Sequence, residues 1–190
     1  MSADRFQAAV ARFDALHAED ASGHAARYHE KLSEFVSMLA EDASEALRLA
    51  AHCQHLRRQQ LPRSAYPEGV LGYKRWRSEL ARLHADEAKE ILIGVGYDDA
   101  IAERVSDLLK KKRLKSDAEV QTLEDAICLT FLVVDFAPFA AKHPPEKVID
   151  IVRKTWAKMS EPGREAAWAL LPTLPRPLVD LVVAALSAPA

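Results

Sequence analysis

Hydrophobic residues recur every three or four positions along almost the whole chain, and no segment alternates convincingly between apolar and polar residues. This spacing is typical of amphipathic helices and argues against strands. The expected helices cover residues 3–17, 24–39, 43–59, 70–94, a stretch after the cap Asp98, 119–136, a stretch after Pro144 and Pro145, a short stretch after Ser160, and an apolar tail at 178–186. The sequence therefore predicts an all-α bundle of about eight or nine helices.

The helix expected at 119–136 is the one that we place at the centre of the bundle. Its second half, residues 127–134, is apolar on almost every side, which is typical of a buried helix. The run is shorter than the roughly 20 apolar residues that span a bilayer. Glu124 and Asp125 lie directly before it, and a carboxylate at the edge of a core costs free energy unless it is paired or ligates a metal. We therefore expect the central helix to point at a functional site.

Composition agrees with one globular domain. The 190 residues are 49% hydrophobic and 28% charged, and we treat 1–190 as a single all-α domain with a core at about 24–140 and a helical extension at about 144–190. The net charge of -2 argues against binding nucleic acid by bulk attraction. Cys53 and Cys128 fall in apolar helical stretches, as reduced core cysteines do. With no apolar signal segment at the N-terminus, we expect a cytoplasmic protein without a membrane partner, and the oligomeric state stays open.

Three histidines and one carboxylate fall on four different expected helices. They are His29, His55, His84 and Asp125. Neutral imidazoles and a carboxylate form a mixed nitrogen and oxygen ligand set that suits zinc, manganese, iron, cobalt or nickel. The alternative is that each histidine is a structural residue with a satisfied hydrogen bond.

The order of these residues resembles the HD-domain superfamily of metal-dependent phosphohydrolases, which are all-α proteins. The strings that carry the resemblance are LRLAAHCQHLRR, LHADEAKEIL with GYDDAIAERVSDLL, and LEDAICL. The resemblance implies that some of His29, His55, His84 and Asp125 hold a divalent transition metal. Where that superfamily has a His-Asp pair, this chain has Gln54 followed by His55. The carboxylate that supports a two-metal site is missing, so we expect a single ion.

A second resemblance extends over nearly the whole chain. The strings RFDALHAED, AAHCQHLRRQQLPRSAYPEGVLGYKRWR, LKSDAEVQTLEDAICLTFL and KTWAKMS are similar to an uncharacterised family catalogued as a domain of unknown function. Some members of that family are labelled glutamyl-tRNA synthetase. The chain shows no Rossmann strand–turn–helix pattern and no ATP-binding signature that would support the label. This resemblance implies no established activity.

Arginines and aromatic residues crowd around a loop rich in proline and glycine, between residues 54 and 77. The expected ligand-binding residues there are Gln54, Arg57, Arg58, Arg63, Tyr66, Arg75 and Arg77. Arginine gives bidentate contacts to phosphate or carboxylate, and aromatic rings stack on a base or sugar. We expect an anionic small-molecule ligand, with the first three arginines facing the same cavity as Asp125. The alternative is a surface ion-pair network with Glu68 and Glu79.

Two glutamates are candidates for proton transfer, Glu19 in the string HAED and Glu87 one turn after His84. HAED alone also fits a solvated turn at the end of a helix. The first hypothesis is therefore an HD-like hydrolase, with a metal that activates water against a phosphate-containing or otherwise anionic molecule. A second is a degenerate HD-like binding or regulatory protein, which the Gln54–His55 doublet favours. A third, an RNA- or tRNA-linked protein, is disfavoured by the net charge.

Overall fold

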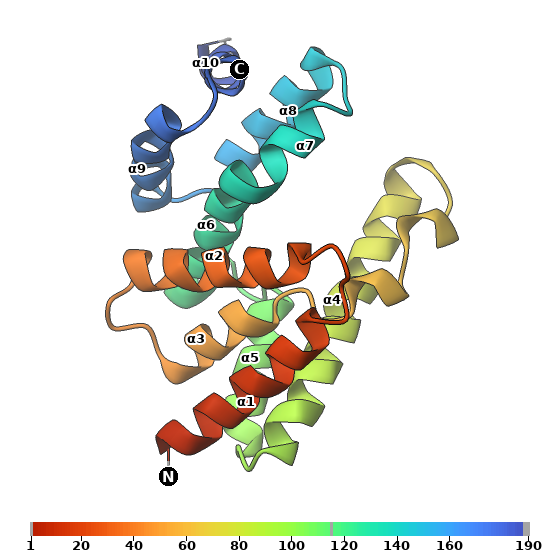
Figure 1. Cartoon of the computed structure of the whole chain (residues 1–190), viewed down its shortest axis with the longest axis vertical. Coiled ribbons are helices and arrows are strands. Elements are labelled where there is room, and N and C mark those ends of the chain that lie inside the picture. The colour runs from red at the N-terminus through yellow and green to blue at the C-terminus, as the bar shows by residue number, and fades with distance from the viewer. Residues whose placement is uncertain (1, 115, 188–190) are drawn as a thin grey trace.

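The computed structural model describes residues 2–114 and 116–187, and within them the chain is helical throughout, with no strand (Figure 1). The all-α prediction is confirmed, but the described residues form ten α-helices instead of eight or nine. Their bounds are α1 Ser2–His17, α2 His24–Leu39, α3 Glu45–Cys53, α4 Gly69–Gly94, α5 Asp99–Leu109, α6 Ala118–Thr130, α7 Phe136–Ala140, α8 Pro145–Trp156, α9 Glu161–Leu170 and α10 Arg176–Ser187. None of these helices has the length and apolarity that crossing a membrane requires.

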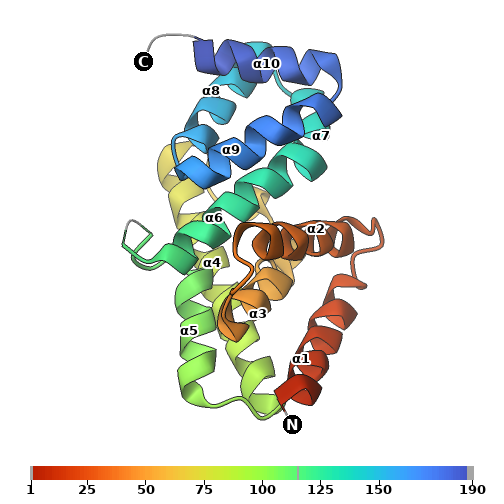
Figure 2. The same ribbon diagram turned by 90° about the vertical axis from the view of Figure 1, so that its left-hand side faces the viewer.

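Helix α6 connects the two ends of the molecule. It packs against α2, α3, α5 and α9, and it continues towards α7 and α8 (Figures 1 and 2). Leu123 and Leu129 on α6 are fully buried, and Leu32 of α2 and Leu47 of α3 are equally buried in the same core. Burying a leucine side chain contributes about 1.5–3 kcal/mol to the free energy of unfolding, so the packing of α6 against α2 and α3 is a main source of stability. Helices α8 to α10 lie beyond α6, at the top in Figure 2.

Helix α3 is shorter than the sequence predicts, ending at Cys53 instead of near residue 59. The reason is the left-handed backbone of Arg57, whose φ of 48° cannot continue a right-handed helix. Two short 3₁₀ turns follow, η1 at Arg58–Gln60 and η2 at Arg63–Ala65, before α4 begins. The break places Gln54 and His55 at the end of a helix, facing the first half of α4.

Side chains cap the starts of two core helices. Ser44 caps α3 by accepting a hydrogen bond from the backbone N–H of Leu47. Asp117 caps α6 by accepting from the first backbone N–H groups of that helix. Asp117 is also bound through both carboxylate oxygens by the guanidinium of Arg104, and charge-assisted bonds are stronger than neutral ones.

The helix predicted at 119–136 is divided by a π-helical turn, η3, at Phe131–Asp135. Pro138 lies in the following helix α7 and has no N–H to donate to the preceding turn, so the widened turn falls where a regular hydrogen bond cannot form. Asp135 closes the π-turn and binds His24 at the start of α2, with 2.6 Å between carboxylate oxygen and ring nitrogen. Single π-turns inside α-helices often mark functional sites.

Candidate functional site

Four histidine rings, from the end of α1, from α2, from the turn after α3 and from α4, form one row. The His17 and His29 rings are stacked with centroids 3.7 Å apart, those of His29 and His55 are 6.3 Å apart, and those of His55 and His84 are 5.6 Å apart. His17, His29 and His84 are each at most 3% exposed. The fold thus gathers the three histidines predicted from the sequence and adds His17.

The ring nitrogens of these histidines differ in what they bind. His29 Nδ1 donates to the backbone oxygen of Ala25 at 2.7 Å, and its Nε2 accepts from the backbone N–H of His55 at 3.2 Å. His84 Nδ1 donates to the backbone oxygen of Leu56 at 2.7 Å, which leaves its buried Nε2 as an acceptor with no protein partner. The His55 ring makes no hydrogen bond to any residue that the structure describes. Of the three histidines predicted from the sequence, His29 therefore has both ring nitrogens engaged, whereas His55 and His84 keep a ring nitrogen for a ligand.

Burial keeps the row uncharged. It lowers the pKa of His29 and of His55 well below the ordinary value, and repulsion from Arg58 lowers the pKa of His55 further. Burial also lowers the pKa of His84 to about 4. At neutral pH the free imidazole nitrogens of His55 and His84 are therefore available as hydrogen-bond acceptors or proton acceptors.

Asp125 is engaged outside this row. Its carboxylate accepts from the side chain of Gln121 at 2.9 Å and from both the backbone N–H and the hydroxyl of Ser160, the N-cap of α9. Gly163 closes over it, because a Cβ at that position would lie 2.6 Å from the carboxyl carbon of Asp125. Asp125 lines none of the cavities that border His55. It anchors α9 instead of meeting the histidines.

The metal centre expected from His29, His55, His84 and Asp125 does not form as one ligand set. Both nitrogens of His29 and both oxygens of Asp125 already have partners within the protein. Over residues 2–114 and 116–187, no three histidine, cysteine, aspartate or glutamate side chains gather in a way that could hold a metal ion. Binding of a divalent metal stays a prediction, for which the structure provides His55 and His84 alone.

Glu19 and Glu87, the two residues predicted to transfer protons, pair with Arg57 and line none of the cavities that border His55. The Arg57 guanidinium lies 3.1 Å from a carboxylate oxygen of Glu87 and 3.8 Å from one of Glu19. These two ion pairs join α4 and the turn that follows α1 to the left-handed turn after α3. The expectation that Arg57 faces a ligand is thus replaced by a structural clamp, because carboxylates on both sides neutralise its charge.

Three more of the predicted ligand-binding residues lie around the loop after η1. Arg75 and the hydroxyl of Tyr66 both bind the carboxylate of Glu79, which corresponds to the ion-pair interpretation. Arg63 donates to the backbone oxygen of Tyr66 at 2.9 Å and lines the second of the cavities below. Tyr66 and Arg75 line no cavity that borders His55.

Arg58 and Arg77 differ from these arginines because neither guanidinium has a hydrogen bond or an ion pair with any residue described. The guanidinium of Arg58 lies over the ring of Trp76, 5.2 Å from its centroid. Burial lowers the pKa of Arg58, and repulsion from Arg77 lowers it further. We refer to these two residues as the arginine pair. Two neighbouring, partly buried cations without a carboxylate favour the binding of an anion.

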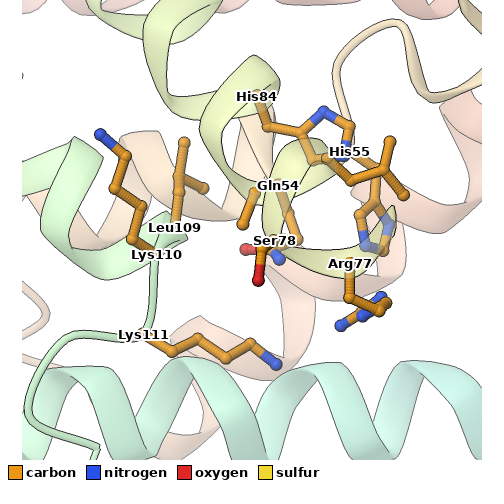
Figure 3. A pocket seen from close by; sticks show the side chains of 10 residues that line it. Gln54, His55, Arg77, Ser78, His84, Leu109, Lys110 and Lys111 are labelled. Atoms are coloured by element: carbon orange, nitrogen blue, oxygen red, sulfur yellow. The ribbon is translucent and has the colours of Figure 1, made fainter. Parts of the chain in front are cut away.

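Three adjoining cavities surround the arginine pair, and His55 lines all of them. The first, about 230 Å³, borders Arg77 and is lined by Gln54, Ser78, His84 and Lys110 among others (Figure 3). The second, about 330 Å³, is lined by Tyr28, His29, Arg58, Arg63 and Trp76 among others. The third, about 540 Å³, has Arg58, Tyr73, Phe131, Phe139 and Asp135 in its wall. The structure thus brings Gln54, His55, His84, Arg58 and Arg77 to one place.

His24 and Asp135 were missed from the sequence. They form an ion pair, 2.6 Å long, at the border of the second and third cavities. His24 is the first residue of its helix, and Asp135 directly follows an apolar run. No local pattern connects two residues 111 positions apart.

Fold and site together define an all-α protein with adjoining cavities that are lined by histidine and arginine side chains. The chain matches the family model described as "Domain of unknown function (DUF4202)" over residues 7–182, and it belongs to that family. No curated protein and no solved structure matches the chain. The predicted membership of a domain family of unknown function is thereby confirmed, whereas the resemblance to HD-domain proteins stays an expectation.

Proposed function

We propose that this protein binds a phosphate-containing or otherwise anionic small molecule at the arginine pair, beside His55. The observation that supports this most strongly is the absence of any carboxylate bound to Arg58 or Arg77 in the described chain. Of the other arginines of the same segment, Arg57 and Arg75 have carboxylate partners, and Arg63 donates to the backbone oxygen of Tyr66.

The acidic groups in the cavity walls cannot replace such a ligand. Asp135 attracts Arg58 at longer range, but its carboxylate is bound to His24. Asp20 accepts from the side chain and backbone of Ser22 and from the backbone of Ala25. A phosphate presents several acceptor oxygens and a guanidinium presents five donors, so a bound phosphate would relieve the repulsion between the arginines and satisfy their donors together.

A second candidate function is hydrolysis of the bound phosphate ester. The observation in its favour is His55, an uncharged imidazole without a hydrogen-bonding partner next to Arg58. In this reaction His55 accepts a proton from water as the water oxygen bonds to phosphorus, the ester P–O bond breaks, and the leaving oxygen is protonated from solvent. Release of inorganic phosphate from a phosphate monoester, measured with and without a chelator and compared with His55→Asn, tests both this step and the expected metal.

The binding proposal is tested by calorimetric titration of inorganic phosphate into the folded protein. We expect the double variant Arg58→Gln/Arg77→Gln to lose phosphate binding. The matched control is Arg75→Gln/Arg82→Gln, which removes the same charge from two exposed arginines of α4 that have carboxylate partners. Equal phosphate affinity in both double variants would show that bulk charge, not the arginine pair, holds the anion.

A further inference from the structure

The first of the three cavities contains two buried polar groups that the protein leaves without partners. Gln54 is 4% exposed, and its side-chain amide makes no hydrogen bond to the described protein. His84 is 3% exposed, and its Nε2 has no partner. Both side chains line the same cavity, and Figure 3 shows the Gln54 amide, the Ser78 hydroxyl and Arg77 around one space. We refer to this space as the Gln54 cavity.

The two unpartnered acceptors in this small cavity indicate which ligand atoms would bind there. A buried acceptor without a hydrogen bond costs about 1–3 kcal/mol, and the large majority of buried side-chain polar atoms in proteins have a partner. The Nε2 atom of His84 can only accept, because its Nδ1 carries the proton that is donated to Leu56. The Oε1 atom of Gln54 is likewise an acceptor. The complementary ligand atoms are therefore donors.

Positively charged side chains at the edge of the Gln54 cavity limit which hydrogen-bond donors a ligand can place there. Arg77, Lys110 and Lys111 all line the Gln54 cavity. Lys111 is bound to Glu124 and Lys110 lies 3.8 Å from a carboxylate oxygen of Asp86, but Arg77 has no carboxylate partner among the described residues. The uncompensated charge of Arg77 disfavours an ammonium donor on the ligand. A fully ionised phosphate has acceptors only, so it belongs at the arginine pair, not between Gln54 and His84. Hydroxyl groups, which donate without charge, fit the remaining space.

From this geometry we propose that the ligand is a small phosphorylated polyol or sugar, whose phosphate lies at the arginine pair and whose hydroxyl groups donate to Gln54 and His84. The inference rests on the proposed function and adds the chemical class of the ligand. Arg77 belongs both to the arginine pair and to the wall of the Gln54 cavity, so one small molecule spans the two places. The cavity volume of about 230 Å³ lies below the roughly 300–1,000 Å³ of sites for drug-sized ligands, which suits a short carbon chain.

The test compares three probes by calorimetry, namely inorganic phosphate, propyl phosphate and glycerol 3-phosphate. The last two share a three-carbon body and differ by two hydroxyl groups. In the wild type we expect glycerol 3-phosphate to bind at least about tenfold more tightly than propyl phosphate, because two buried acceptors gain their partners. Gln54→Leu should reduce that ratio, because His84 alone then accepts a hydroxyl group of the ligand, and should leave the affinity for propyl phosphate unchanged. Gln60→Leu, an exposed glutamine in the same segment, should behave as the wild type.

The outcomes separate the inference from the proposed function. Equal or tighter binding of propyl phosphate by the wild type would overturn the ligand class but leave anion binding intact. An unchanged preference in Gln54→Leu would overturn the role of Gln54, and Gln54→Met, which is closer in shape, repeats the test if the leucine variant fails to fold. No binding of any probe would refute both proposals.

Discussion

Arg58→Met should weaken anion binding without weakening the fold. Methionine keeps an unbranched apolar side chain against Trp76 but removes the guanidinium, which has no carboxylate partner in the described chain. At an effective dielectric constant of about 20, two like charges about 8 Å apart repel by roughly 2 kcal/mol. Loss of the cation–π contact costs about 0.5–1 kcal/mol. We therefore expect the free energy of unfolding to stay unchanged or to rise by about 1 kcal/mol.

The affinity should change in the opposite direction. A hydrogen bond to a charged group contributes about 1.5–3 kcal/mol, so the dissociation constant for inorganic phosphate should rise by roughly 10- to 150-fold. Urea unfolding measures the stability of the free protein, and calorimetric titration measures the affinity of the same sample.

The matched control is Arg75→Met, because Arg75 is 75% exposed and pairs with Glu79. Removing that surface pair should cost at most about 1 kcal/mol and should leave phosphate affinity unchanged. A loss of more than about 2 kcal/mol of stability in Arg58→Met, with unaltered phosphate affinity, would refute the reasoning, because Arg58 would then be a structural residue.

Three further predictions concern the surroundings of the site. Burial lowers the pKa of His84 to about 4, so between pH 6.5 and 4 the unfolded chain binds more protons than the folded one, and the free energy of unfolding should fall by up to about 3 kcal/mol as the pH drops through that window. Urea unfolding from pH 7.5 to 4.5 should show a smaller decline in His84→Gln, and an equal decline in that variant would contradict a lowered pKa of His84. Glu87→Gln should lower the free energy of unfolding by about 1 kcal/mol, because it weakens the ion pair with Arg57, and should change phosphate affinity less than twofold. A large loss of phosphate affinity would show that Glu87 belongs to the ligand-binding site. Gly163→Ala should lower the free energy of unfolding by about 1–3 kcal/mol, because the added Cβ would lie 2.6 Å from the Asp125 carboxyl carbon. The control Gly94→Ala should not destabilise the fold, because its Cβ meets open space, and thermal melting curves compare the two variants.

Local periodicity was sufficient to predict most of the helices. The bounds of α2, 24–39, follow from the apolar stripe of Tyr28, Leu32 and Phe35, which the structure buries. The same reasoning placed His55 and His84 on neighbouring helices, and their rings do meet. These signals lie within a few residues of the positions that they predict, so a single sequence contains them.

Features that depend on distant partners could not be predicted in this way. The break at Arg57 depends on Glu19 and Glu87, and the π-turn ends at Asp135, which binds His24 at the start of another helix. Asp125 was placed in the site because a buried carboxylate needs a partner, but the partner is Ser160 at the start of α9. The physical argument was correct, and the choice among possible partners required the fold.

The partners of the arginines also depend on the fold. From the sequence, the arginines between residues 57 and 77 are equivalent, because each lies in one crowded, turn-rich segment. The structure separates them by their partners, since Arg57 and Arg75 bind carboxylates, Arg63 binds the backbone oxygen of Tyr66, and the guanidinium groups of the arginine pair bind no described residue. Which cations remain for a ligand depends on tertiary packing.

The most direct test of the central claim is a crystal of the whole chain soaked in tungstate, a tetrahedral oxyanion whose anomalous scattering locates it without ambiguity. We expect an anomalous peak between the guanidinium groups of Arg58 and Arg77, beside the His55 ring, and no such peak in crystals of Arg58→Met. Tungstate bound at other basic surfaces, with no peak at the arginine pair, would contradict the proposal that this pair binds the anion.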